Sequence, residues 1–195
     1  MPGELTFPPI QIDVASLVQR SVATLYSHLV TRPTGRAVRL AIEALLADAG
    51  DTAFSLIDLS EVTVLDFSCA DEVVAKLLLR YQEADRPREA YFVIRGLRDL
   101  HREPIEVVLE RQRLTAVTQR DDGEYELLGP RSGDEDSAWR LVETRGRIDA
   151  AELPALLPRA EDRLALDGLV RRRVVFVDSR LGSVHALSRL AARSS

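Results

Sequence analysis

The stretch that decides the fold runs from Ile57 to Val74 and reads Ile-Asp-Leu-Ser-Glu-Val-Thr-Val-Leu-Asp-Phe-Ser-Cys-Ala-Asp-Glu-Val-Val. It begins inside the apolar run Phe54–Leu59, which is typical of a central strand. After a short step it enters a series of apolar residues at the spacing of one helix face. That face consists of Ala70, Val73, Val74, Leu77, Leu78 and Tyr81. The stretch therefore predicts a strand, a turn and an amphipathic helix in direct succession.

Similar units flank this stretch on both sides and extend the same strand-and-helix order. Before it, we predict a strand at Ile10–Val14 and a helix that is capped by Thr34 and ends at Ala49–Asp51. The buried face of that helix consists of Val38, Ala41, Ile42, Leu45 and Leu46. After it, we predict a strand at Ala90–Arg95, a helix with Pro104 in its first turn, and a closing hairpin of Thr115–Thr118 and Tyr125–Leu128. This order predicts a small α/β domain with a single sheet and helices packed on it.

The chain carries its charge unevenly. Of its 195 residues, 26 are Lys or Arg and 31 are Asp or Glu, so the formal net charge is −5. The first 135 residues hold fifteen basic and twenty-three acidic side chains, whereas the last 60 hold eleven and eight. Between these parts, Gly129–Asp136 mixes Gly, Pro and Ser with acidic residues, as linkers do. We predict one domain at 1–130, a linker at 131–136 and a second domain at 137–195.

The C-terminal part combines short helices with a hairpin. Its predicted elements are a helix at Ala138–Thr144 closed by Gly146, a short helix after the capping box Asp149–Glu152, a helix from Pro158 to about Arg172, and strands at Val174–Asp178 and Ser183–Leu187. Three short helices followed by a hairpin are typical of a small winged helix-turn-helix domain.

The turn within Ile57–Val74 resembles the STAS domain, the fold of the anti-sigma-factor antagonists. In that family, a strand ending in Asp-Leu-Ser is followed by a short apolar step and an Asp-Ser-Ser-Gly turn that opens a helix. Here Asp58-Leu59-Ser60 matches the strand end. Asp66 falls on the aspartate of the turn and Ser68 on its second serine, which is the phosphoacceptor in the antagonists.

The match is closer to the STAS-like group of uncharacterised function, which reads Ser-Phe-x-Asp-Glu at the turn. The corresponding residues are Ser68–Glu72, and Leu29–Arg36 is similar to that group's lead-in to its first helix. The resemblance covers residues 10–128 and implies a single mixed sheet with packed helices. It also implies a partner protein, a histidine-kinase-type ATPase of the anti-sigma kind.

Two interpretations of Ser68 stay open. Ser68-Cys69-Ala70-Asp71 reads as a capping box, in which Ser68 is the N-cap and an acidic residue follows at the third helical position. Alternatively, Ser68 is a phosphoacceptor, although the nearby carboxylates would repel a phosphate. In both cases the corner forms a candidate partner surface, whose residues are Asp66, Ser68, Cys69, Asp71 and Glu72.

The C-terminal part carries a set of arginines that could contact DNA phosphates. These candidates are Arg159, Arg163, Arg171, Arg172, Arg173 and Arg180. Acidic residues on the same predicted helix oppose this interpretation, and winged helices also serve as protein-interaction or dimerisation modules. DNA binding and protein binding therefore both remain open.

Several function classes find no support in the sequence. The single cysteine excludes an internal disulfide framework or a Cys-rich zinc site. Its three histidines lack ligand spacing, and no phosphate-binding glycine loop occurs. We expect a cytoplasmic protein that is not an enzyme and uses no metal or cofactor. The first hypothesis is a regulatory protein that binds an ATPase, and the second is a DNA-binding regulator whose STAS-like part dimerises or senses a small ligand.

Overall fold

The computed structural model describes residues 10–14 and 28–192, and its centre is a five-stranded sheet. The strands, in the spatial order β1-β3-β5-β6-β7, are β1 (Ile10–Asp13), β3 (Thr52–Asp58), β5 (Glu89–Arg95), β6 (Ala116–Gln119) and β7 (Tyr125–Leu128). The pairs from β1 to β6 are parallel, and β6 with β7 forms an antiparallel hairpin. These strands confirm the expected α/β fold with a mixed sheet.

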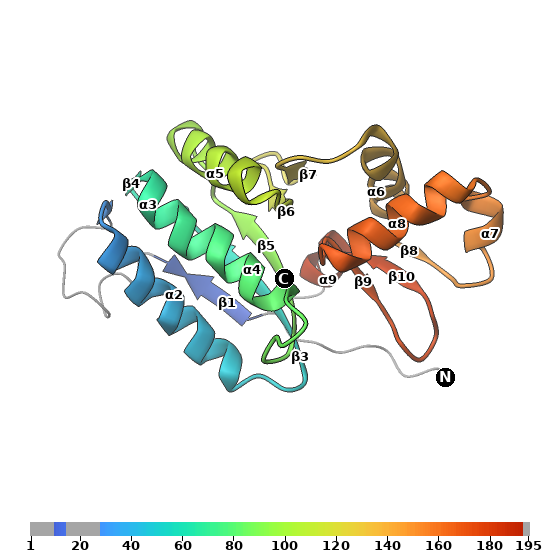
Figure 1. Ribbon diagram of the computed structural model, residues 1–195, viewed down its shortest axis with the longest axis horizontal. Helices are drawn as coiled ribbons and strands as arrows, with labels where there is room; N and C mark the ends of the chain where they lie inside the picture. Colours follow the sequence, from blue (N-terminus) through green and yellow to red (C-terminus); the bar gives the residue numbers. More distant parts are fainter. Residues whose placement is uncertain (1–9, 15–27, 193–195) are drawn as a thin grey trace.

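Helices cover one face of this sheet (Figure 1). They are α2 (Arg32–Ala47), α3 (Phe67–Ala70), the π-helical segment η1 (Asp71–Lys76), α4 (Leu77–Gln82) and α5 (Asp99–Gln112). The segments α3, η1 and α4 follow one another directly, so they act as one long helix with a widened middle. A two-stranded parallel ribbon, β2 (His28–Leu29) with β4 (Val64–Leu65), lies where α3 begins.

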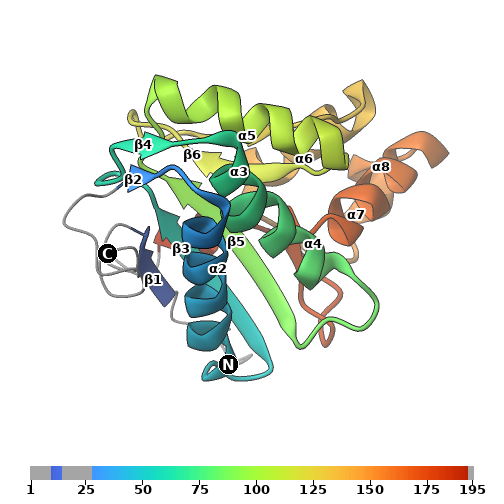
Figure 2. The same cartoon turned by 60° about the vertical axis from the view of Figure 1, so that its left-hand side comes forward.

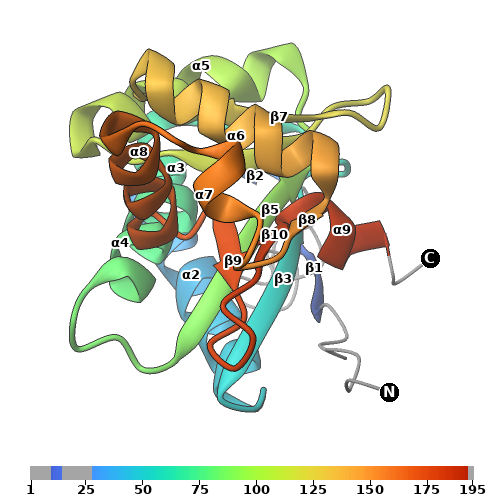
Figure 3. The same cartoon turned by 90° about the vertical axis from the view of Figure 1, so that its right-hand side faces the viewer.

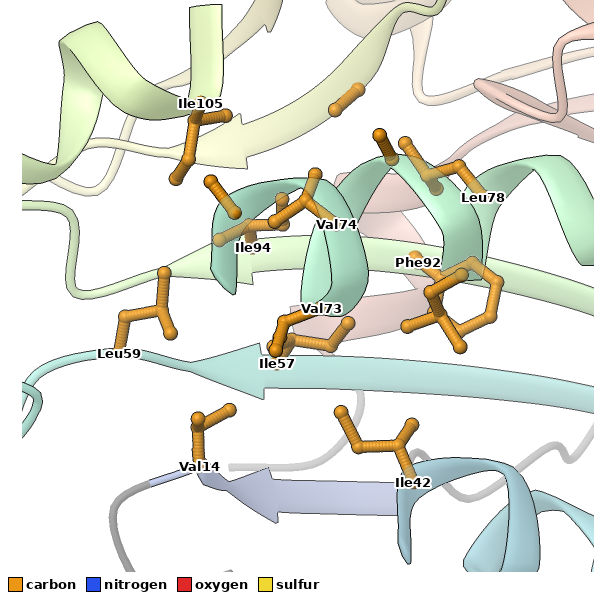
Figure 4. Close-up of a cluster of buried hydrophobic side chains, with 14 of the residues drawn as sticks. Val14, Ile42, Ile57, Leu59, Val73, Val74, Leu78, Phe92, Ile94 and Ile105 are labelled. Carbon is orange, nitrogen blue, oxygen red and sulfur yellow. The ribbon is translucent and has the colours of Figure 1, made fainter. Parts of the chain in front are cut away.

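The core beneath these helices forms as the apolar spacing predicts. In Figure 4, Val73 and Leu78 of the long helix lie over Ile57 of β3 and Phe92 of β5. All six apolar residues predicted for this helix face are buried. On α2 the agreement is partial, because Leu45 remains 42% exposed.

The C-terminal segment covers the opposite face of the sheet (Figure 3). Its elements are α6 (Gly133–Arg145), β8 (Arg147–Ile148), α7 (Leu153–Leu156), α8 (Ala160–Arg171), β9 (Val175–Val177), β10 (Val184–Ala186) and α9 (Leu187–Ala192). The three strands form an antiparallel sheet in the order β8-β10-β9. The predicted hairpin is thus confirmed as β9–β10, and β8 adds a strand that the sequence pattern did not predict.

The two parts of the chain share one apolar core. Phe54 of β3 and Tyr91 of β5 belong to the same buried cluster as Trp139 of α6 and Phe176 of β9. The rings of Tyr91 and Phe176 meet edge to face, with their centroids 5.3 Å apart. The division into domains at 1–130 and 137–195 stays a prediction, but each part covers apolar surface of the other.

Several predicted helix starts need correction. The N-cap of α2 is Thr31 rather than Thr34, because the Thr31 hydroxyl accepts the amide of Thr34. Pro104 lies inside α5 rather than in its first turn, since that helix begins at Asp99. Four of the six residues of the predicted linker 131–136 are helical, because a capping box between Ser132 and Glu135 starts α6 at Gly133.

We expect the whole chain to unfold in a single transition, because the sheet and the C-terminal segment bury each other. Trp139 is the only tryptophan, is buried in the shared core, and reports on the C-terminal segment by its fluorescence. Far-UV circular dichroism reports on all helices together. Urea titrations followed by both signals should give one common midpoint. Two separate midpoints would show that the predicted domains unfold independently.

Candidate functional site

The candidate site lies at one end of the molecule, where the parallel strands β3 and β5 finish. The chain leaves β3 toward β4 and α3, and it leaves β5 toward α5, so both helices begin at this edge (Figure 2). Helix α5 contacts both β4 and α3. In open parallel sheets, this carboxyl edge is the usual place for binding sites.

Asp66, rather than Ser68, caps the helix at this corner. The Asp66 carboxylate accepts the Cys69 amide at 2.8 Å, and its backbone is extended as an N-cap requires. Ser68 is the second residue of α3 and is half-buried. Its hydroxyl donates to the Asp66 carboxylate at 2.9 Å. The predicted capping box at Ser68 is therefore wrong, but the corner does join a strand to a helix.

Cys69 is a buried structural residue. Its Sγ donates to the carbonyl oxygen of Thr31 at 3.0 Å. Gly35 of α2 packs directly on it, since a Cβ at Gly35 would lie 2.9 Å from the Cys69 Cα. Burial, together with the negative charge of Asp66, raises the pKa of the Cys69 thiol to about 12. The thiol therefore stays protonated at neutral pH and is inaccessible to a partner in this conformation.

Glu72 and Asp71 are occupied by an internal network of cations. Glu72 is only 2% exposed, and its carboxylate accepts hydrogen bonds from Arg32 at 3.0 Å, from Arg39 at 3.2 Å and from Lys76. Arg32 also bonds to Asp71 at 2.7 Å. These contacts tie α2 to η1 and leave neither carboxylate free for a partner. The i, i+4 spacing of Glu72 and Lys76 was the only sequence signal of this network.

Burial by itself would raise the pKa of Glu72, but the hydrogen bonds from Lys76, Arg39 and Arg32 outweigh it. The pKa of Glu72 is therefore lowered from its usual value of 4.5. The carboxylate remains ionised near neutral pH and stabilises the junction between α2 and η1.

The exposed part of the corner is apolar, which the sequence analysis did not anticipate. Four of the eight exposed large apolar side chains in the described part of the chain lie on its elements, and each of the four is between 39% and 55% exposed. They are Val30 after β2, Val64 of β4, Phe67 of α3 and Leu100 of α5. These residues lie on neighbouring elements, because β2 pairs with β4 and α5 contacts both β4 and α3, and together with the half-buried Asp66 and Ser68 we call them the apolar corner. Such a concentration is typical of protein-binding surfaces.

A polar cluster lies beside the apolar corner at the ends of β3 and β5. The Asp58 carboxylate accepts the Arg95 guanidinium at 2.9 Å and the Ser60 amide at 2.9 Å. Burial by itself would raise the pKa of Asp58, but the hydrogen bonds from Ser60 and Arg95 outweigh it, so the pKa lies below its usual value. Gly96 has a φ of +69°, and a Cβ there would collide with Ser60. The cluster therefore closes the turn after β3.

Two of the arginines predicted to contact DNA instead join the C-terminal segment to the sheet. Arg172 donates to the Thr115 hydroxyl at 2.7 Å and to the Pro130 carbonyl at 2.6 Å. Arg173 pairs with Glu89, and its guanidinium lies 5.3 Å from the centre of the Tyr91 ring. Neither guanidinium is presented as a DNA contact in this conformation.

The other arginine candidates are exposed, with differing surroundings. Arg159 precedes α8 and pairs with Asp162 and with Asp134, so its charge is largely compensated. Arg163 donates to backbone carbonyls of the loop before α8. Arg171 and Arg180 have no ion pair among the described residues, and Arg180 lies in the turn between β9 and β10.

Comparisons of this chain with known proteins found no matching family model, no matching curated protein and no matching solved structure. Within the described ranges, no helix combines the length and apolar character needed to cross a membrane. Among the same residues, no group of three or more His, Cys, Asp or Glu side chains is placed to hold a metal ion.

The capping geometry predicts which of two substitutions lowers the free energy of unfolding more. Asp66→Ala removes the N-cap and the acceptor of Ser68, and should lower the free energy of unfolding by about 1–2 kcal/mol. Ser68→Ala removes one hydrogen bond of a half-buried hydroxyl and should cost about 0.5–1 kcal/mol. Urea unfolding of both variants measures the ranking. A larger loss for Ser68→Ala would mean that the serine is the cap.

Glu72→Gln should destabilise the protein by about 3 kcal/mol, because it leaves three cations without their shared carboxylate. In the unaltered protein, the stabilisation from Glu72 is present above the unfolded pKa near 4.5 and is lost as the pH falls through the lower folded pKa. The variant should lack this part of the acid dependence. Urea unfolding across a pH series measures both effects.

Glu83→Gln is a suitable control, since Glu83 is exposed and forms only a 3.7 Å pair with Arg80. It should behave like the unaltered protein at every pH. Equal behaviour of the two variants would contradict a special role for Glu72.

Proposed function

We propose that this chain is a non-enzymatic regulatory protein that binds a partner protein through its apolar corner. The observation that carries the proposal is the exposure of Phe67, Val64, Val30 and Leu100 at the edge where α3 and α5 begin. Burying one large side chain of this kind in an interface contributes about 1.5–3 kcal/mol. Together they could hold a partner without any contribution from the buried carboxylates.

The fold supports a STAS-like identity for the first part of the chain. A single mixed sheet carries α2, the α3–η1–α4 run and α5 on one face, and Asp66 and Ser68 lie together at a strand-to-helix corner. The resemblance of this corner to the anti-sigma-factor antagonists suggests a histidine-kinase-type ATPase as the partner. Ser68 borders the exposed Phe67, so a phosphate there would add negative charge at the proposed interface.

The test compares partner binding by two variants of the tagged full chain, purified from its own cells. Phe67→Ser should reduce the amount of a co-purifying histidine-kinase-type ATPase about ten- to hundredfold, as the loss of one buried aromatic predicts. Leu164→Ser is the matched control, since Leu164 is 66% exposed on α8, away from the corner. Mass spectrometry quantifies the partner and detects phosphate on Ser68.

Ser68→Asp should weaken the same partner, whereas Ser68→Ala should largely preserve it. An ATPase retained by Phe67→Ser, or lost equally from the Leu164→Ser control, would contradict the proposed binding surface.

A second candidate function is DNA binding by the C-terminal segment. The order α6-β8-α7-α8-β9-β10, with the strands arranged β8-β10-β9, supports a winged-helix identity. In such a domain, α8 would be the recognition helix and the β9–β10 turn the wing. Arg163, Arg171 and Arg180 are the exposed cations of these two elements.

Fluorescence anisotropy of the full chain with DNA duplexes across a salt series tests this candidate. Arg171→Ala and Arg180→Ala should each reduce the slope of log affinity against log salt by about 0.9. Arg140→Ala, an exposed residue of α6 paired with Asp136, should leave the slope unchanged. No salt-dependent binding to any duplex would remove the DNA function.

A further inference from the structure

Helix α2 has a second apolar face that nothing in the described part of the chain covers. Its inner face packs Val38, Ile42 and Leu46 against the sheet. Its outer face contains only alanine and leucine from residue 37 to residue 47, namely Ala37, Leu40, Ala44, Leu45 and Ala47, and Ala41 lies at its border, partly buried against the core. Leu40 is 48% exposed and Leu45 is 42% exposed. Figure 1 shows α2 at the outer edge of the helical layer, beside the α3–η1–α4 run.

The shape of this outer face favours another helix as its partner. The apolar residues extend over about three turns, whereas a solvated helix normally places charges there. The alanines between the two leucines would let a second helix backbone approach closely. The face is separate from the apolar corner, which lies beyond the start of α2.

The charges of α2 are arranged so that the helix is complementary to itself. All four lie on one flank, namely Arg32, Arg36, Arg39 and Glu43. Leu40 follows Arg36 by four residues and precedes Glu43 by three, so both of these charges border the outer face. Arg32 and Arg39 are engaged by Asp71, Glu72 and Glu43. Arg36 is exposed and forms no ion pair among the described residues. Glu43 receives Arg39 on one oxygen, Oε1, at 2.5 Å.

Arg36 and Glu43 lie about two turns apart on the same flank. When two copies of α2 pack antiparallel about Leu40 and Ala41, Arg36 of each copy lies opposite Glu43 of the other. The same arrangement places Ala37 opposite Ala44 of the second copy and opposes the two helix dipoles. Parallel packing would instead bring the two Arg36 side chains together, which is unfavourable.

We infer that the protein forms a homodimer through antiparallel packing of two α2 helices. In a dimer with two-fold symmetry, each contact between the copies occurs twice. The pair of Arg36 and Glu43 can form twice, once on each side of the symmetry axis. The 16 residues of α2 span about 24 Å, so the interface is small and the dissociation constant lies in the micromolar range. Because α2 starts beside the apolar corner, the two corners lie at opposite ends of the dimer and remain accessible.

Sedimentation equilibrium of the full chain at increasing concentration tests the association. The mass should rise from 21.7 kDa toward twice that value over the micromolar range. Leu40→Glu should weaken the dimer at least about tenfold, because it buries an unpaired charge in the interface. Leu164→Glu, at an exposed leucine of α8, should dimerise like the unaltered chain. A monomer throughout, or equal behaviour of both variants, would overturn the inference.

Disulfide trapping tests the antiparallel orientation. Ala41→Cys lies near the symmetry axis and should cross-link to itself on oxidation, within the Cα separation that a disulfide allows. Ala37→Cys should cross-link with Ala44→Cys but not with itself, because two copies of residue 37 are about 10 Å apart along the helix axis. The native Cys69 is buried and does not compete. Self-cross-linking of Ala37→Cys without that of Ala41→Cys would overturn the proposed packing.

Discussion

The central strands β3 and β5 are apolar on both faces, and the rest of the structure depends on covering both. Phe54 and Leu56 point to one side of the sheet, whereas Ala53 and Ile57 point to the other. Parallel strands that are buried on both faces need a layer on each side. Helices α2 to α5 provide the first layer, and the C-terminal segment provides the second.

Covering the second face creates a contact region between the first part of the chain and the C-terminal segment, which we call the seam. Polar groups buried in this region need hydrogen-bond partners. The chain crosses this seam at Pro130, and after α8 the side chains of Arg172 and Arg173 reach back to the first part. Their long side chains bond to the Pro130 carbonyl, the Thr115 hydroxyl and the Glu89 carboxylate. Two of the three arginines in the run Arg171–Arg173, which resembles a nucleic-acid contact in the sequence, thus become part of the internal structure.

A second constraint acts on the helical layer, where the buried Glu72 must keep its cations. Arg32 and Arg39 come from α2, and Lys76 comes from the same helical run as Glu72 itself. Satisfying this carboxylate fixes α2 against η1 and turns Arg32 and Arg39 toward it. Leu40 and Leu45 of the same helix remain exposed to solvent.

The sequence by itself determined the order of strands and helices, the buried face of the helix from Ala70 to Tyr81, and the hairpins that close each part. These features depend on local periodicity and on turn residues. The tertiary structure decided which polar residues are available. Asp66, and not Ser68, caps α3. The buried Glu72 pairs with Arg32 of α2, and the Arg173 guanidinium lies over the Tyr91 ring. The contacts of Glu72 and Arg173 join residues far apart in the chain, and the free energy of burying a charge depends on such neighbours rather than on local spacing.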